Sequence, residues 1–531
     1  MPMPGVSQAG APAWHGACPP RWRDRRTPAI VRLVASLDSH RHRHGSPRWR
    51  RLALLAGPFL LFATYIVPAP AGMAAAAWHC AGLAAWMALW WSTEAVPVPV
   101  TALLPLLVLP LAGVTPIDAT AAAYAHPLIF LFLGGFLLAL GIQKHQLHRR
   151  VALTIVDRLG TQPAALVGGF LAASGFLSMW VSNTATAMMM LPIALSVIAT
   201  VRGGSTDAGG GEPGDRPSAE FATALLLAVA YGASIGGLGT LIGTPSNALL
   251  AAFAQEKYGI RIGFAQWMVV GVPLSLLLGL CAWLVLTRLA FALGGLQFAT
   301  GRDAIRSQLS DLGPVGGNEM RVAAVFLATA VLWLFRPLLS RIDGLAGLSD
   351  PAIAVAAAMS LFLLPAAQGG GQRLLDWRDA RELPWGTLIL FGGGLSLAAA
   401  IGASGLADWI GRALALFAGW PGLALLLLVT AVVVFLTELT SNTATTATFL
   451  PLMGVLAVAA GLAPLALMAP VALAASAAFM LPVATPPNAI IFGSGRIAII
   501  DMARTGLWLN LAAIGLVAVL APVLLKLAFP A

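Results

Sequence analysis

Long apolar stretches separated by short polar segments fill the chain from about residue 52 to its end. An α-helix needs roughly 20 mainly apolar residues to cross the hydrocarbon core of a bilayer. Stretches near that length predict about 11 membrane-spanning helices, at 52–69, 74–93, 98–114, 127–143, 220–242, 267–293, 320–338, 351–367, 386–403, 464–482 and 505–529. Since a bilayer offers the backbone no hydrogen-bond partners, we expect an all-α polytopic membrane protein.

Two further apolar blocks, at 163–201 and 420–461, are too long for one span, and each has a Ser-Asn-Thr cluster in its middle. We interpret each block as a re-entrant hairpin whose two arms meet at a polar tip. Non-helical backbone at membrane depth is tolerated only where it is buried in protein or lines a wet cavity. The two tips are therefore predicted to line a polar site.

The chain also repeats itself. Ser-Asn-Thr occurs at 182–184 and again at 441–443, an offset of 259. Thr-Pro-x-Asn occurs at 244–247 and again at 485–488, an offset of 241. Two halves with polar breaks in corresponding hydrophobic segments are typical of secondary transporters. The Gly-rich spans of the two halves are the fourth and ninth predicted crossings, and this odd separation predicts an inverted repeat.

Composition excludes the soluble classes of protein. The 531 residues are 59% hydrophobic and 10% charged, whereas a soluble domain carries about 25% charged residues. The formal net charge is +10, but the ten arginines and two aspartates of residues 1–51 account for +8 of it. We expect this Arg-rich tail to be disordered and cytoplasmic, and no fold accompanies it that would read nucleic acid. An alternative start at Met73, the next methionine after Met3, would remove the tail.

These patterns predict four parts. They are a basic tail (1–51), a first half (52–294), a cytoplasmic linker (295–319) and a second, inverted half (320–531). Lys144, Arg149 and Arg150 follow the fourth span, which agrees with a cytoplasmic N-terminus because cytoplasmic loops are enriched in basic residues.

The two tips lie in segments that are almost free of charge. From 159 to 201 there is no Lys, Arg, Asp or Glu, and from 413 to 495 there is only Glu438. An anion at the tips would have to be bound by helix N-termini, hydroxyl donors and bound cations. The alternative is that each Ser-Asn-Thr cluster merely caps its own helix.

The two Thr-Pro-x-Asn motifs are expected to interrupt helices, because proline removes a backbone donor. The freed carbonyls of Gly243 and Ala484 could then coordinate a hard cation such as Na⁺, which suits carbonyl, amide and hydroxyl oxygens. The alternative is a proline kink with a packing role. Glu438 is costly at membrane depth, and we interpret it as a hydrogen-bonded brace of the second hairpin rather than a ligand of the site.

Other classes of protein find no support. The chain shows no nucleophile–base pair, no phosphate-binding loop and no metalloenzyme spacing, and its three cysteines form no motif. A membrane-embedded enzyme would need such a cluster. A channel would not need paired broken helices, which favour alternating access.

The motifs resemble the divalent anion/sodium symporter family, which contains sodium-coupled dicarboxylate, citrate and sulfate transporters. The resemblance rests on residues 126–135 (His-Pro-Leu-Ile-Phe-Leu-Phe-Leu-Gly-Gly), on the two Ser-Asn-Thr-Ala-Thr runs and on the two Thr-Pro-x-Asn motifs. It implies about 11 crossings, two re-entrant hairpins, an inverted repeat, a homodimer and elevator-type transport. The chain departs from the family pattern at Ser246, where the family often has a second proline, as at Pro487.

The resemblance also implies site residues. The substrate would be bound by Ser182, Asn183, Thr184, Ser441, Asn442, Thr443 and Thr485. A first Na⁺ would be bound by Ser178, Asn183 and the Gly243 carbonyl, and a second by Thr437, Asn442 and the Ala484 carbonyl.

We therefore predict a transporter that imports C4-dicarboxylates such as succinate, malate or fumarate together with Na⁺. The alternative within the family is a sodium-independent exchanger of dicarboxylates, sulfate or related anions. We expect this protein to lie in the bacterial inner membrane, with the lipid bilayer and a second copy of the chain as its partners.

Overall fold

The computed structural model describes residues 47–160, 162–203, 216–291, 293, 301–367, 371–413 and 419–529. These residues belong to one unit that spans 46–531. The predicted tail lies outside the described residues except for 47–51, which begin helix α2. The predicted linker lies outside them at 295–300, and its remainder contains helix α14.

Helices make up the described chain, joined by turns and one isolated β-bridge between Pro365 and Arg373. The helices of the first half are α2 (Pro47–Ile66), α3 (Ala75–Thr93), α4 (Val98–Thr101), α5 (Leu104–Leu111), α6 (Ile117–Ala122), α7 (Pro127–Lys144), α8 (Leu147–Leu159), α9 (Pro163–Ser178), α10 (Asn183–Gly203), α11 (Arg216–Gly236), α12 (Pro245–Tyr258) and α13 (Phe264–Leu284). Those that follow are α14 (Gly301–Asp311), α15 (Gly317–Leu339), α16 (Asp350–Leu363), α17 (Trp385–Ala403), α18 (Leu406–Ala413), α19 (Gly422–Thr437), α20 (Asn442–Ala459), α21 (Leu465–Ala475), α22 (Pro486–Phe492) and α23 (Ile499–Ala528).

Within the described ranges, eight helical segments are long and apolar enough to cross a membrane. They are Ile117–Lys144, Asn183–Val201, Ala219–Gly239, Phe264–Ala290, Gly317–Leu339, Trp385–Ala403, Asn442–Ala459 and Ile499–Ala528. The all-α fold predicted from the sequence is confirmed. The number of crossings and the re-entrant path of the two hairpins stay predictions.

Three predicted spans are shorter or more divided than expected, two of them next to a proline. The span at 98–114 forms two short helices, α4 and α5, because Pro105 in the first turn of α5 cannot continue the hydrogen bonds of α4. The span at 351–367 ends at Leu363, because Leu364 before Pro365 takes an extended conformation. The span at 464–482 is helical only to Ala475, where α21 ends.

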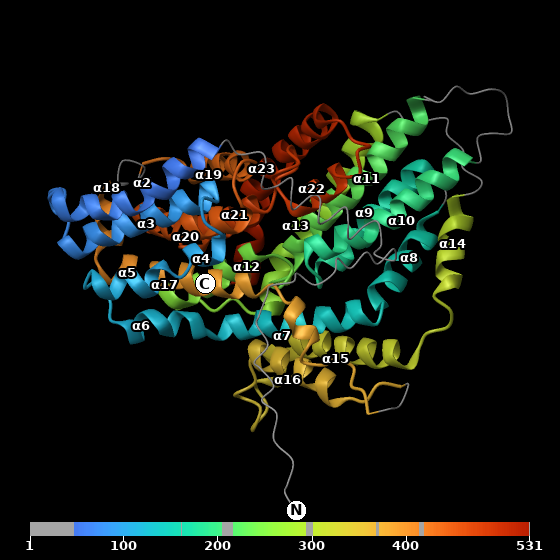
Figure 1. Ribbon diagram of the computed structural model, residues 1–531, viewed down its shortest axis with the longest axis horizontal. Helices are drawn as coiled ribbons and strands as arrows, with labels where there is room; N and C mark the ends of the chain where they lie inside the picture. The colour runs from blue at the N-terminus through green and yellow to red at the C-terminus, as the bar shows by residue number, and fades with distance from the viewer. Residues whose placement is uncertain are drawn as a thin grey trace, which may run out of the picture. The chain divides into compact units, whose positions relative to one another are not determined.

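The helix boundaries repeat at the offset found in the motifs. Adding 259 to the bounds of α9 gives the bounds of α19, and adding it to the first residues of α8 and α10 gives the first residues of α18 and α20. Each Ser-Asn-Thr cluster therefore lies between the two arms of a helical hairpin, α9–α10 or α19–α20 (Figure 1).

A sharp turn, here called an elbow, follows α7 and again α17. The residue before the next helix has a left-handed backbone in both elbows: Gln146 with φ 58° and Gly405 with φ 79°. The helix after each elbow is tied by a side-chain donor to the backbone carbonyl of a residue far away in the sequence. Arg150 of α8 donates to Gly313 (3.0 Å) before α15, and Trp409 of α18 donates to Ala71 (3.3 Å) before α3.

Helix α11 is the most enclosed of the long helices, since every residue from Phe221 to Gly239 is buried. It packs against α9 so closely that a Cβ on Gly236 would lie on the carbonyl of Gly175. Small residues allow such close approach of membrane helices. The halves also interlock: α12 packs on α20 and α21, while α22 packs on α10 and α11.

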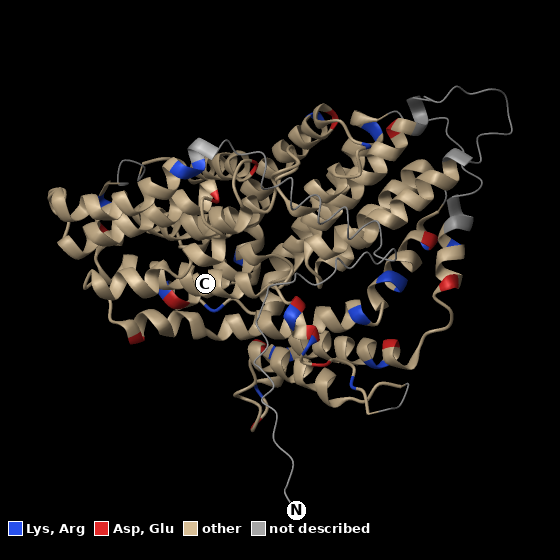
Figure 2. Ribbon diagram, viewed as in Figure 1, with Lys and Arg blue, Asp and Glu red and all other residues tan. Residues whose placement is uncertain are grey.

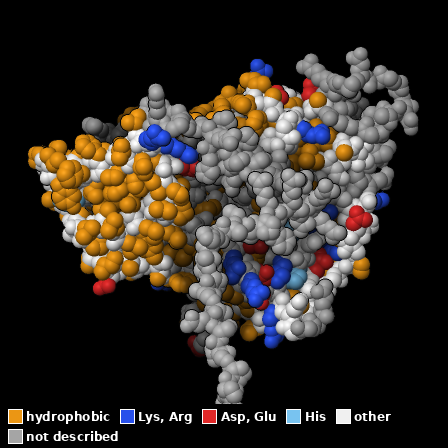
Figure 3. All heavy atoms as spheres, viewed as in Figure 1, with side chains coloured by type: hydrophobic (Ala, Val, Ile, Leu, Met, Phe, Trp, Pro, Cys, Tyr) orange, Lys and Arg blue, Asp and Glu red, His pale blue; other side chains and the backbone are white. Residues whose placement is uncertain are grey.

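The outer helices present apolar faces. Only 17% of the apolar window of α15 and 33% of that of α23 is buried, and large side chains of α2 such as Leu55 and Phe59 are exposed. Figure 3 shows hydrophobic side chains covering the face over α2, α3 and α5. Figure 2 shows charged residues gathered mainly near α7, α8, α14 and α15. Such a surface suits a bilayer better than water.

Candidate functional site

The first Ser-Asn-Thr cluster joins residues from two separate segments. Asn183 is the first residue of α10, and the Oδ1 of its amide lies 2.5 Å from the Oγ of Ser178 at the end of α9. The same amide position lies 3.2 Å from the carbonyl oxygens of Ala233 in α11 and of Gly243. Gly243 lies in the segment between α11 and α12, here called the first break; the second break is the segment between α21 and α22. Ser178 is fully buried. The structure therefore brings together Ser178, Asn183 and Gly243, the three residues predicted for the first cation.

This arrangement is chemically two-sided. If the amide oxygen of Asn183 faces the cluster, four oxygens converge with only the Ser178 proton between them, which is an environment suited to a cation. If the amide turns over, its nitrogen can donate to Ser178, Ala233 and Gly243 instead. The same residues can thus bind a cation or satisfy one another without it.

The second cluster repeats the hydroxyl–amide pair of the first at an offset of 259. Thr437 Oγ1 lies 2.8 Å from Asn442 Oδ1 and 2.9 Å from the carbonyl oxygen of Ala475. One hydroxyl proton faces two acceptors here, so this cluster also has more oxygens than donors. Ala484 is buried in the following break, where its N–H donates to Leu481. Ala233 and Ala475 were not predicted, because their contribution is a backbone carbonyl that leaves no mark in the sequence.

The asparagines of the Thr-Pro-x-Asn motifs donate hydrogen bonds to backbone carbonyls of the two breaks. Asn247 Nδ2 donates to the carbonyls of Gly237 (3.1 Å) and Thr240 (2.8 Å). Asn488 Nδ2 donates to the carbonyls of Ala478 (3.4 Å) and Leu481 (3.0 Å), each 241 residues further on. These motifs were predicted only to interrupt helices, and their asparagines were assigned no role. The repeated spacing was the signal that could have identified them.

Glu438 ties the second hairpin to the break after α21. Its carboxylate accepts hydrogen bonds from the backbone N–H groups of Phe479 (2.7 Å), Met480 (2.9 Å) and Leu481 (2.9 Å). It also accepts from Asn510 Nδ2 of α23 at 2.7 Å. Four donors compensate a charge that is 97% shielded from solvent. The interpretation of Glu438 as a brace is confirmed.

The residues predicted to bind substrate differ in their surroundings. Ser182 is exposed and its Oγ accepts from the N–H of Ala185 (3.3 Å), so it caps α10 as the alternative interpretation expected. Ser441 makes no such cap bond. Thr485 is buried and caps α22 by accepting from the N–H of Asn488.

Two hydroxyls near the tips remain uncommitted. Thr184 and Thr443 are half-buried, and within the described residues their hydroxyls make no hydrogen bond, which leaves both available to a ligand. The N-termini of α10 and α20 lie beside them and add positive dipole character. In the described part of the chain no group of three His, Cys, Asp or Glu residues could hold a metal. A cation would therefore be bound by neutral oxygens.

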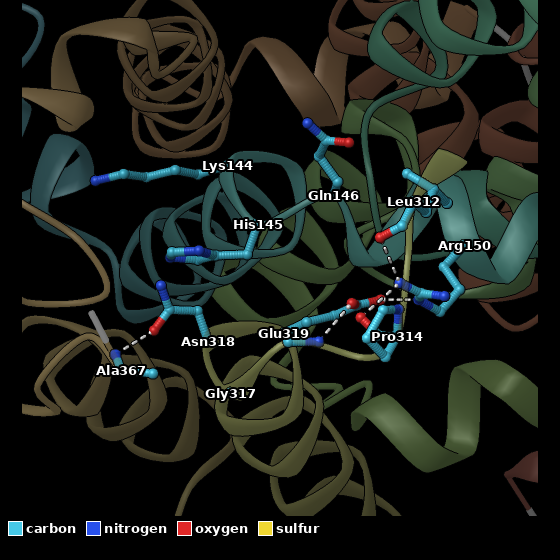
Figure 4. A pocket seen from close by; sticks show the side chains of 11 residues that line it. Lys144, His145, Gln146, Arg150, Leu312, Pro314, Gly317, Asn318, Glu319 and Ala367 are labelled. Atoms are coloured by element: carbon cyan, nitrogen blue, oxygen red, sulfur yellow. Dashed lines mark hydrogen bonds and ion pairs between the residues drawn. The ribbon is translucent and has the colours of Figure 1, made fainter. Parts of the chain in front are cut away.

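A separate cavity of about 310 Å³ lies at the first elbow (Figure 4). Lys144, Arg150 and the first turn of α15 line it. Both basic side chains already form ion pairs: Lys144 with Asp379 (2.6 Å) and Arg150 with Glu319 (2.5 Å). Because none of the predicted site residues lines this cavity, it is distinct from the candidate site.

Comparison with known proteins agrees with the motifs. A family model described as the sodium:sulfate symporter transmembrane region matches residues 47–527. The chain is 42% identical over 465 residues to a protein of Staphylococcus saprophyticus named sodium-dependent dicarboxylate transporter SdcS, covering 87% of this chain and 89% of the relative. It is 41% identical over 462 residues to the protein of that name from Staphylococcus aureus strain USA300, covering 87% and 88%.

The fold is also similar to that of a solved structure, the YdaH transporter of Alcanivorax borkumensis. The TM-score is 0.56 at 15% sequence identity, covering 91% of this chain and 99% of that one. At this identity the similarity concerns the fold alone.

The family match covers nearly the whole described chain and includes both hairpins and both breaks. The expectation of a membrane transporter rather than an enzyme is therefore confirmed. The chain belongs to the divalent anion/sodium symporter family, as its paired motifs predict.

Proposed function

We propose that this protein is a secondary active transporter that imports C4-dicarboxylates, such as succinate, malate or fumarate, together with Na⁺. The observation that carries the proposal is the matched pair of oxygen clusters, Ser178–Asn183 and Thr437–Asn442. Both lie in segments that have no basic side chain. Relatives named sodium-dependent dicarboxylate transporters support both the substrate class and Na⁺ as the coupling ion.

The first Na⁺ would be bound by Ser178, Asn183 and the carbonyl of Gly243, with the Ala233 carbonyl beside them. The second would be bound by Thr437, Asn442 and the carbonyl of Ala484, with Ala475 nearby. Hydroxyl, amide and carbonyl oxygens suit a hard monovalent cation. Neither set of proposed ligands includes a carboxylate, which a divalent cation would favour.

The dicarboxylate would be bound at the two tips. Its proposed ligands are Ser182, Asn183, Thr184, Ser441, Asn442, Thr443 and Thr485. The uncommitted hydroxyls of Thr184 and Thr443, with the N-termini of α10 and α20, offer donors to an oxyanion in each half. Because the segments 159–201 and 413–495 contain no arginine or lysine, the bound cations would supply the charge that compensates the substrate, and this is the physical basis of coupling.

The remaining expectations belong to the same proposal. The protein would lie in the bacterial inner membrane with its N-terminus in the cytoplasm. It would work as a homodimer of inverted repeats with two re-entrant hairpins, moving its site in elevator fashion. The resemblance of the motifs to the family supports these features, and the bacterial relatives support the location.

Uptake of labelled succinate into proteoliposomes, with and without an inward Na⁺ gradient, tests the proposal. We expect uptake to require the gradient. We expect Asn183→Ala and Asn442→Ala each to abolish it, while Asn318→Ala, in the remote elbow cavity, leaves it intact. Size-exclusion profiles would establish that the variants fold. Uptake that ignores Na⁺ but requires internal dicarboxylate would refute symport and identify an exchanger instead.

A further inference from the structure

The two halves meet through hydroxyl groups at the breaks. Thr244 Oγ1 of the first break lies 3.3 Å from Ser476 Oγ of the second, and both side chains are buried. A second contact joins Thr446 Oγ1 of α20 to Ser246 Oγ of α12 at 2.9 Å, again between buried groups. We call these two contacts the inter-half bridge.

The Thr244–Ser476 contact adjoins both candidate cation clusters. Thr244 directly follows Gly243, whose carbonyl belongs to the first cluster. Ser476 directly follows Ala475, whose carbonyl accepts from Thr437 in the second cluster. The bridge therefore joins the peptide units that carry one carbonyl of each cluster.

The second contact reaches the second cluster by another route. Thr446 Oγ1 lies 2.8 Å from the carbonyl oxygen of Asn442, as well as near Ser246. Ser246 is in the first turn of α12, two residues after Thr244. A shift of the first break would thus displace Ser476, next to the Ala475 carbonyl, and Thr446, which contacts the Asn442 carbonyl.

The bridge, unlike the clusters, is not repeated. At the corresponding offsets, Ser246 matches Pro487, Ser476 matches Ile235 and Thr446 matches Ala187, none of which has a hydroxyl. Features needed to hold a break, such as the asparagines of both motifs, occur in both halves. The hydroxyl pairs of the inter-half bridge occur only once, so the repeated fold does not explain them. They need a reason that concerns the two halves jointly.

We propose that the inter-half bridge couples the two cation clusters, so that binding at one increases affinity at the other. This inference rests on the proposed function. A cation bound at the first cluster would fix the carbonyl of Gly243 and the adjoining backbone. Because buried hydrogen bonds tolerate little displacement, the bridge would then fix Ala475 and Asn442 in their binding geometry, lowering the ordering cost for the second cation.

The test uses Na⁺-dependent thermal stabilisation of the purified full chain without substrate, beside Na⁺-dependent succinate uptake. For wild type we expect a Hill coefficient for Na⁺ above 1. We expect Ser476→Ala and Ser246→Ala each to lower the Hill coefficient toward 1 and to raise the half-saturating Na⁺ concentration about fivefold, the low end of allosteric coupling. The double variant should differ from the sum of the two single variants if both contacts act on one link.

Thr430→Val and Ser396→Ala are matched controls, because each removes a buried hydroxyl that has no hydrogen-bond partner within the described residues. We expect both to keep the wild-type Hill coefficient. Should the double variant fail to fold, Ser476→Ala alone decides, since it removes a single oxygen.

Folded bridge variants with wild-type Na⁺ cooperativity would overturn the inference, and so would a wild-type Hill coefficient of 1. Both results would leave sodium-coupled transport standing. A wild-type protein whose stability and uptake ignore Na⁺ would instead refute the proposed function, and the inference with it.

Discussion

Replacing Gly237 with alanine is expected to weaken Na⁺ binding at the first cluster selectively. Gly237 follows α11 and faces the cluster. A Cβ at this position would lie 2.8 Å from Asn183 Oδ1 and 3.0 Å from the carbonyl oxygen of Gly243. Even close carbon–oxygen contacts in proteins stay beyond about 3.3 Å. The methyl group would therefore push two proposed ligands away by roughly 0.5 and 0.3 Å.

The size of the effect follows from the small change in ligand distance that a metal site tolerates. Ligand distances in a working site hold to about ±0.2 Å, so the displacement exceeds the tolerance at both oxygens. The backbone itself is not strained by alanine, because Gly237 is not among the glycines with positive φ. We expect the half-saturating Na⁺ concentration to rise about tenfold, equivalent to about 1.4 kcal/mol.

The assay is the Na⁺ dependence of succinate uptake and of thermal stability in Gly237→Ala. Gly279→Ala on α13 is the matched control, because its Cβ would meet no atom within 4 Å. The second half already has Ala478 at the position corresponding to Gly237, so the reverse change there, Ala478→Gly, should not raise the Na⁺ requirement. If Gly237→Ala binds Na⁺ like wild type, Asn183 and Gly243 do not form a cation site together.

Three further predictions concern the second hairpin and the first elbow. Glu438→Ala should destabilise the protein by about 3 kcal/mol or more, seen as a lower Tm, because it leaves several buried N–H donors without an acceptor. Arg150→Ala should lower the free energy of unfolding by about 2–4 kcal/mol, seen as a lower Tm, since it leaves the nearly buried Glu319 without its partner; an unchanged Tm would contradict this. Burial lowers the pKa of His148 on α8 below 6.5, so its contribution to stability is present above pH 6.5 and is lost as the pH falls. His148→Gln should therefore flatten the acid side of a plot of Tm against pH.

The two helical arms on either side of each tip could be predicted, because both the polar tips and the offset are visible in side-chain types, whereas their re-entrant path stays a prediction. Helices α9 and α19 begin and end where the repeat requires. The substrate residues were named from the resemblance to the family, and their role stays a prediction. The pairing of Ser178 with Asn183 and of Thr437 with Asn442 agrees with the shared offset.

Contacts made by the backbone or across long separations could not be predicted. The carbonyls of Ala233 and Ala475 enter the clusters through main-chain geometry alone. Glu438 could be recognised as a brace, but its acceptor role toward residues 479–481, about forty positions away, depends on how α21 ends. The inter-half bridge was hidden because Ser246 looked only like a departure from a repeated proline.

The charge-free character of the hairpin segments has a consequence for how the membrane potential would act. Moving one elementary charge across the membrane is worth about 2.3 kcal/mol per 100 mV. Within 159–201 and 413–495 the only ionisable acid or base is Glu438. Without bound ions, these two segments would themselves carry at most that one negative charge across the membrane. In the loaded step, each Na⁺ beyond those that neutralise the dianion would add a positive charge, so the voltage across the bilayer would set the rate of that step according to how many cations are bound.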